Sequence, residues 1–105
     1  FQTPKIKKNF SHSYHLYPLL VNFKKVGLSK KEIFKQFLKH NIRLQVHYIP
    51  VNTQPYYKKK FGFIKKDFTN SINFYNKEIS LPIYNDLKIN ELNHIKKVCK
   101  KIFKI

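Results

Sequence analysis

The end of the chain carries the pattern that most restricts its fold, an apolar stripe at helical spacing. The members of this stripe are Leu92, Ile95, Val98, Cys99, Ile102 and Phe103. Lysines fill most of the positions between them, so a helix here is apolar on one side and charged on the other, with Asn90 as its expected N-cap. Such a helix needs a surface against which its apolar side is buried. A chain of 105 residues must supply that surface within one small domain.

A second helix is predicted from Ser29 to about His40. Ser29 and Glu32 form the sequence pattern of a capping box, in which the two residues bond to each other's backbone. Asn41 follows the helix and tolerates the left-handed conformation that often ends one. The apolar residues behind the cap recur at helical spacing: Ile33, Phe34, Phe37 and Leu38.

Residues 42–48 alternate apolar and polar side chains, which is the pattern of a half-buried strand. The alternation predicts that Gln45 and His47 lie on the face away from the core. The core-facing set is expected to be Ile42, Leu44, Val46 and Tyr48.

Two further strands are expected, one at residues 14–23, where Pro18 indicates an edge position or a bulge, and one at residues 79–83. The connecting segments are predicted as a turn at 24–28, a loop at 50–62, a helix at 70–78 with Ile72, Phe74 and Tyr75 on its buried side, and a turn at Asn85 and Asp86. This order predicts a two-layer α/β fold, a small three-stranded sheet with helices packed on one face. Residues 1–13 are expected to be an incoming linker, and residues 14–105 the domain.

The net charge of +17 raises the possibility of nucleic-acid binding. However, Arg43 is the only arginine among the 22 basic residues, and surfaces that read bases or clamp phosphates favour arginine. Most of this charge is therefore interpreted as a solvated lysine surface that attracts phosphorylated small molecules weakly. A small nucleic-acid-binding module with a tyrosine platform stays open as an alternative.

Several kinds of site are disfavoured by the composition. With only two glycines, the chain has no glycine-rich phosphate loop, and its five acidic residues are scattered. His12 and His15 would point to opposite faces of a strand, which argues against a metal site. Cys99 is expected to be a buried structural thiol. No apolar run is long enough to cross a membrane, so a cytoplasmic protein is expected.

The segment from Val46 to Tyr57 is the strongest candidate for a site. It places His47 at a strand end, followed by a loop that contains two prolines together with Asn, Gln and further tyrosines. Polar loops at rigid strand ends are frequent binding sites, and tyrosines suit sugar rings and nucleobases. The residues alone leave a second interpretation equally open, a turn that packs its aromatic side chains against the core.

A series of motifs along nearly the whole chain, from about residue 11 to the end, carries a resemblance. The motifs are His15-Leu16-Tyr17-Pro18-Leu19, His40-Asn41-Ile42, Gln45-Val46-His47-Tyr48-Ile49-Pro50, Gln54-Pro55-Tyr56-Tyr57 and Ile79-Ser80-Leu81-Pro82-Ile83-Tyr84. In this order and at these intervals, the chain resembles the C-terminal domain of the DegT/DnrJ/StrS family of sugar aminotransferases. Within that family it is most similar to the transaminases that place a 4-amino group on UDP-linked deoxysugars, as in the pseudaminic acid pathway.

The resemblance implies a fold-type-I enzyme, usually a homodimer, that uses pyridoxal phosphate and transfers an amino group from glutamate to a UDP-linked keto sugar in glycan or polysaccharide biosynthesis. It also implies that the lysine holding the cofactor belongs to a larger N-terminal domain upstream of Phe1. None of the lysines here is expected to have the desolvated setting that such a lysine needs. This stretch alone is therefore expected to be inactive, whether as one part of an enzyme or as the remnant of a truncated gene.

The resemblance assigns substrate binding rather than catalysis to this domain. It implies six binding residues, in order of preference His47 and Tyr48, His15 and Tyr17, and Asn52 and Gln54. Asn52 stands where the family usually has histidine, and its amide can bond a hydroxyl or a phosphate but cannot titrate.

Overall fold

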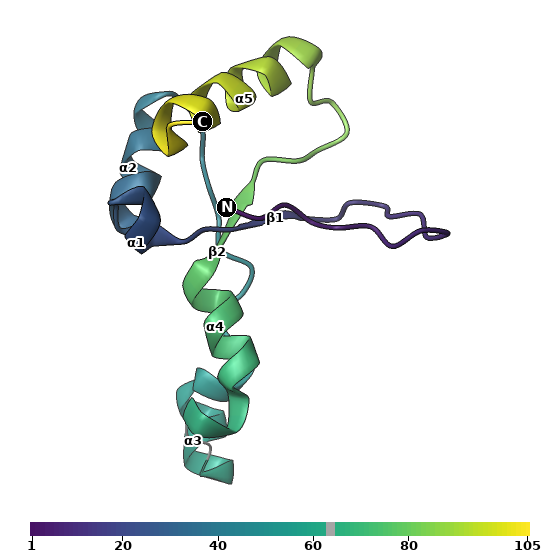
Figure 1. Ribbon diagram of the computed structural model, residues 1–105. Helices are drawn as coiled ribbons and strands as arrows, with labels where there is room; N and C mark the ends of the chain where they lie inside the picture. Colours follow the sequence, from purple (N-terminus) through teal and green to yellow (C-terminus); the bar gives the residue numbers. More distant parts are fainter. Residues whose placement is uncertain (63–64) are drawn as a thin grey trace.

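A computed structural model of the protein describes residues 1–62 and 65–105. The described part forms a small α/β domain from which one helical arm, made of α3 and α4, extends (Figure 1). In chain order the elements are β1 (Tyr17–Leu20), α1 (Phe23–Val26), α2 (Lys30–Lys39), the 3-10 turn η1 (Val51–Thr53), α3 (Pro55–Phe61), the 3-10 turn η2 (Lys65–Phe68), α4 (Thr69–Lys77), β2 (Glu78–Leu81) and α5 (Ile89–Phe103). Within these described residues no helix is long and apolar enough to cross a membrane.

The strands β1 and β2 pair antiparallel, and their register decides which side chains share a face. Leu19 lies opposite Ile79, and Pro18 lies opposite Ser80. Because successive side chains of a strand point to opposite faces, the Leu19–Ile79 pair and the Pro18–Ser80 pair lie on different faces. Leu19 and Ile79 are part of the core, whereas the face that carries Ser80 borders the site described below.

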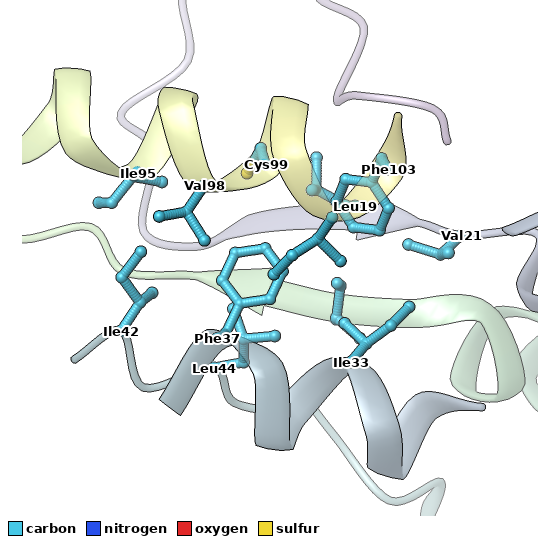
Figure 2. Close-up of a cluster of buried hydrophobic side chains, with 12 residues drawn as sticks. Leu19, Val21, Ile33, Phe37, Ile42, Leu44, Ile95, Val98, Cys99 and Phe103 are labelled. Atoms are coloured by element: carbon cyan, nitrogen blue, oxygen red, sulfur yellow. The ribbon is translucent and has the colours of Figure 1, made fainter. Parts of the chain in front are cut away.

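The core joins the sheet to α2 and α5, and Figure 2 shows the side chains that meet between the two helices. Phe37 of α2 is fully buried, with its ring centroid 6.0 Å from that of Phe103 on α5. The predicted stripe of α5 is thus packed against α2 and the sheet. The buried members of the core are Leu19, Val21, Ile33, Phe37, Ile42, Leu44, Ile79, Ile95, Val98, Cys99, Ile102 and Phe103.

The capping box of α2 is present as predicted. The Ser29 backbone N–H donates to Glu32 Oε2 at 2.7 Å, and Ser29 Oγ accepts from the Glu32 N–H at 3.2 Å. Asn41, just beyond the helix, has the expected left-handed φ of 58°. The predicted cap of α5 is wrong by two residues: Lys88 is the N-cap, because the Glu91 carboxylate reaches back to the Lys88 N–H at 2.8 Å.

The third strand predicted at residues 42–48 does not form. Gln45 makes one isolated bridge to Ser80, with backbone bonds of 3.2 and 2.8 Å, and the sheet of the described residues has two strands. In an antiparallel ladder the next bonded pair would be His47 with Glu78. The His47 N–H instead donates to the Glu78 side chain, at 3.1 Å from Oε2, which ends the ladder.

The side chains of this segment follow the predicted alternation only at its start. Ile42 and Leu44 are buried as expected, and Val46 is half-buried. The inward orientation predicted for Tyr48 is wrong, because that side chain is 65% exposed.

Two other segments differ from the sequence prediction because they contain short helices. The strand at 14–23 is shorter than expected and is followed by α1, since Asn22 Oδ1 caps the Lys25 N–H and Gly27 ends the helix at a φ of 72°. The loop predicted at 50–62 contains η1 and α3, with Pro55 at the helix start and Gly62 as a left-handed end. The helix predicted at 70–78 is confirmed as α4, but Phe74 is 41% exposed rather than buried.

The start of the chain is attached to the domain. Gln2 and Leu20 exchange two backbone hydrogen bonds, at 2.9 and 3.0 Å, on the β1 side of the sheet. The Phe1 ring lies 5.0 Å from that of Phe103. The sheet is therefore extended by one isolated bridge at each edge: Gln2 pairs with Leu20 of β1, and Gln45 pairs with Ser80 of β2.

Cys99 is expected to resist thiol reagents while the protein is folded. Its side chain is 8% exposed, and burial raises the pKa of the thiol from 9.0 to about 11. At pH 8 only about one folded molecule in a thousand carries the reactive thiolate. Titration with a disulfide reagent should therefore be slow at pH 8, and fast after urea is added. Rapid labelling of the folded protein would contradict the burial.

Candidate functional site

A polar cavity of about 370 Å³ lies where the start of β1, the segment after α2 and the end of β2 converge. Its lining residues are His15, Leu16, Arg43, Gln45, His47, Tyr48, Ser80, Leu81, Pro82, Ile83 and Tyr84. The lining contains imidazole, amide, guanidinium and hydroxyl groups but no carboxylate and no lysine. Such a surface can bond the hydroxyl groups and oxyanions of a ligand.

His47 is held in this cavity through its backbone. The Glu78 side chain, which is fully buried, accepts from the His47 N–H at 3.1 Å. The other carboxylate oxygen of Glu78, Oε1, accepts from Ser80 Oγ. The imidazole meets the Tyr48 ring edge-on, with 4.8 Å between centroids. Glu78 is therefore a positioning residue that links β2 to the His47–Tyr48 segment.

The Nδ1 atom of His47 is buried and has no hydrogen-bond partner in the described part of the protein. Buried polar atoms are usually paired, and one left unpaired costs about 1–3 kcal/mol. Because this atom has almost no accessible surface, a ligand in the cavity could bond it only after a small shift of the surrounding side chains. Among the described side chains that line the cavity, His47 is the one with a buried polar atom that has no partner.

Lys30 is a partly buried lysine whose pKa is influenced by Glu78. Its ammonium group donates to the Tyr75 carbonyl oxygen at 2.6 Å and lies over the rings of Phe23 and Tyr75. Burial lowers the pKa of Lys30, and the negative charge of Glu78 opposes that shift. The expectation that no lysine is desolvated is therefore wrong for Lys30, since its neighbours on α1 and α4 cover it.

The structure brings together three of the six residues implied by the resemblance. His15, His47 and Tyr48 line the polar cavity. Tyr17 does not, because it shares the other face of β1 with Leu19 and lines an apolar groove of about 490 Å³ beside α5.

Asn52, in η1, and Gln54, just before α3, lie outside this cavity. Asn52 Oδ1 accepts from Ser71 Oγ of α4 at 3.4 Å, and Gln54 joins η1 to α3. The binding roles of Tyr17, Asn52 and Gln54 stay predictions.

Sequence reasoning did not select three residues that shape this site, Arg43, Glu78 and Tyr84. Arg43 could have been found, because residues 43, 45 and 47 share one face of an alternating segment. Tyr84 follows the Leu-Pro-Ile run after β2, where the chain passes the cavity. Glu78 gave no signal, since its bond to His47 spans 31 residues.

Nearly the whole chain is similar to a family of known proteins. The model of the DegT/DnrJ/EryC1/StrS aminotransferase family matches residues 1–103. A UDP-4-amino-4,6-dideoxy-N-acetyl-beta-L-altrosamine transaminase of Campylobacter jejuni is 38% identical over 96 residues, which cover 91% of this chain and 25% of the relative.

Two solved structures have the same fold. The aminotransferase PseC of Helicobacter pylori, involved in the biosynthesis of pseudoaminic acid, superimposes with a TM-score of 0.76 at 32% identity, over 86% of this chain and 24% of that one. The putative sugar aminotransferase Spr1654 of Streptococcus pneumoniae, in its PMP form, superimposes with a TM-score of 0.70 at 27% identity. The match covers 86% of this chain and 22% of that one. The chain thus spans about a quarter of the length of the relatives it matches.

Proposed function

The chain belongs to the DegT/DnrJ/EryC1/StrS aminotransferase family, and from this premise we propose that it is the substrate-facing C-terminal part of a nucleotide-sugar aminotransferase. The reaction proposed for the longer protein moves an amino group from glutamate to a keto-deoxysugar linked to UDP. The similarity to a UDP-amino-dideoxysugar transaminase supports this substrate class. The observation that carries the proposal is the polar cavity with the unpaired Nδ1 of His47.

In this proposal the cavity binds the sugar. His47 Nδ1 accepts a hydrogen bond from a sugar hydroxyl, and the Tyr48 ring, 65% exposed beside it, offers an apolar face to the sugar ring. His15, which also lines the cavity, supplies a second imidazole. Because Glu78 fixes the backbone at His47, this segment is already ordered before the sugar binds, and binding loses less conformational entropy.

The family's cofactor, pyridoxal phosphate, supplies the electron sink for amino transfer when it is bound. The residues described here do not fit the role of its covalent holder. No lysine lines the polar cavity, and the partly buried Lys30 donates to the Tyr75 carbonyl oxygen outside it. We therefore assign the cofactor to the remaining part of the longer protein, with this chain closing over the sugar. The homodimer and the cytoplasmic location expected for such an enzyme belong to the same proposal.

The test uses the longest protein that contains this chain, purified with pyridoxal phosphate. We expect an absorbance band of the bound cofactor that changes when glutamate is added, with release of 2-oxoglutarate. The chain of 105 residues by itself is expected to give neither signal. A full-length protein without the band would refute the proposal. Salt-sensitive DNA binding in its place would favour the nucleic-acid alternative.

A further inference from the structure

A second cavity, of about 530 Å³, adjoins the polar cavity and shares Arg43, Pro82 and Tyr84 with it. We refer to it as the adjoining cavity; its other lining residues are Asn41, Ile42, Leu87, Asn90, Glu91, His94 and Ile95. The two cavities together offer an extended ligand one polar compartment and one of mixed character. Arg43 lines both cavities and lies where they meet.

Arg43 is exposed and makes no side-chain hydrogen bond or ion pair with the residues that the structure describes. Its guanidinium group has five N–H donors in a planar fork that matches the oxygens of a phosphate. All the other basic residues of the chain are lysines, whose compact charge does not offer this geometry. An uncommitted arginine between two cavities is therefore an available oxyanion site.

The charges in the two cavities decide which part of an extended ligand each would hold. The adjoining cavity contains Glu91, whose carboxylate accepts from the Lys88 N–H at 2.8 Å and from the Tyr84 hydroxyl at 3.3 Å. This carboxylate repels a phosphate placed deeper in the adjoining cavity. A neutral heterocycle is not repelled, and the Asn41 and Asn90 amides offer it donors and acceptors.

We propose that Arg43 binds the diphosphate of the nucleotide sugar, with the sugar in the polar cavity and the base in the adjoining cavity. This assignment rests on the proposed function, because it supposes that the ligand is a sugar nucleotide. It makes Arg43 a specificity-determining residue that separates nucleoside diphosphates from nucleosides. The same fork could instead hold a carboxylate of the amino donor, and the experiment distinguishes these two anions.

The experiment measures the binding of UDP and of uridine by calorimetry, in the longest protein that contains this chain. Arg43→Gln is expected to weaken UDP binding roughly 10- to 100-fold and to leave uridine binding unchanged. Arg43→Lys should recover only part of the loss, because the fork is absent. Lys24→Gln, an exposed lysine on α1 outside both cavities, is the control for the change in net charge.

The outcomes separate this inference from the proposed function. Unchanged UDP binding in Arg43→Gln would overturn the inference, as would a higher KM for glutamate with UDP affinity intact. An equal loss of UDP affinity in Lys24→Gln would mean that the net charge of the protein, and not Arg43 itself, controls binding. That result would also overturn the inference. If the cofactor test fails but UDP binding still depends on Arg43, the transaminase proposal fails while the nucleotide site stands. Thermal unfolding of each variant confirms that a loss of binding is not a loss of folding.

Discussion

Replacing Phe37 with alanine is expected to destabilise the domain by about 3–5 kcal/mol. The Phe37 side chain is fully buried where α2 meets α5, and its ring packs against Phe103 at 6.0 Å. Removing the ring leaves a cavity at the contact that buries the apolar stripe of α5, and close-packed surroundings relax only partly into such a space. Urea unfolding followed by circular dichroism should show a midpoint lowered by roughly 1 M or more.

Leu38→Ala is the matched control for this substitution. It removes an apolar side chain from the next position of the same helix, but that side chain is 56% exposed. Its effect should stay within about 0.5 kcal/mol of the wild-type stability, as for other surface substitutions. Equal losses for Phe37→Ala and Leu38→Ala would mean that the contact between α2 and α5 does not hold the domain together.

The helices α2, α4 and α5 could be predicted because their signals are local, whereas the shorter α1 and α3 were not predicted. In α2, Ser29 and Glu32 lie one turn apart and the buried positions follow a period of 3.6 residues, so a short window of sequence contains the whole argument. The cap of α5 shows the limit of such signals. Asn90 has the preferred side chain for a cap, yet Glu91 selects Lys88 by bonding its N–H.

The sheet was harder to predict because strand pairing depends on distant residues. The alternation at residues 42–48 correctly predicts that Ile42 and Leu44 are buried. It does not show whether the segment joins the sheet, because that depends on the bond between the His47 N–H and Glu78. A carboxylate 31 residues away takes the N–H that a ladder would have used. Local pattern shows which side a side chain faces, and it does not show which acceptor the backbone finds.

The candidate site shows the same division. His47 was selected because motif and alternation agreed on it, and the structure places it in a polar cavity with an unpaired ring atom. Tyr17 was selected by motif alone, and the alternation of β1 sends it to the opposite face. Arg43 shares the period of Gln45 and His47 but belongs to no motif. Face and motif agree on His47, whereas Arg43 is indicated by its face alone and Tyr48 by its motif alone, and all three line the cavity.

Replacing His47 with alanine is expected to lower kcat/KM for the nucleotide sugar about 100-fold in the longest protein that contains this chain. The substitution removes the buried acceptor Nδ1 and leaves a sugar hydroxyl without a partner. The reaction of the bound cofactor with glutamate alone should change little, because the proposal gives His47 contact with the sugar only. Steady-state rates for the sugar, and single-turnover absorbance changes with glutamate, measure the two effects separately.

Two further variants decide whether Nδ1 is the atom responsible. Asparagine places its amide oxygen near the position of Nδ1, so His47→Asn should recover activity to within about 10-fold of the wild type, with the histidine's proton chemistry absent. His40→Ala, at the end of α2 and outside the polar cavity, should leave kcat/KM unchanged, since His94 bonds the His40 backbone oxygen rather than its ring. If His47→Asn is as impaired as His47→Ala, His47 acts in proton transfer and not only as the acceptor of a hydrogen bond from the sugar. If His47→Ala also stops the reaction with glutamate, the assignment of this cavity to the sugar is wrong.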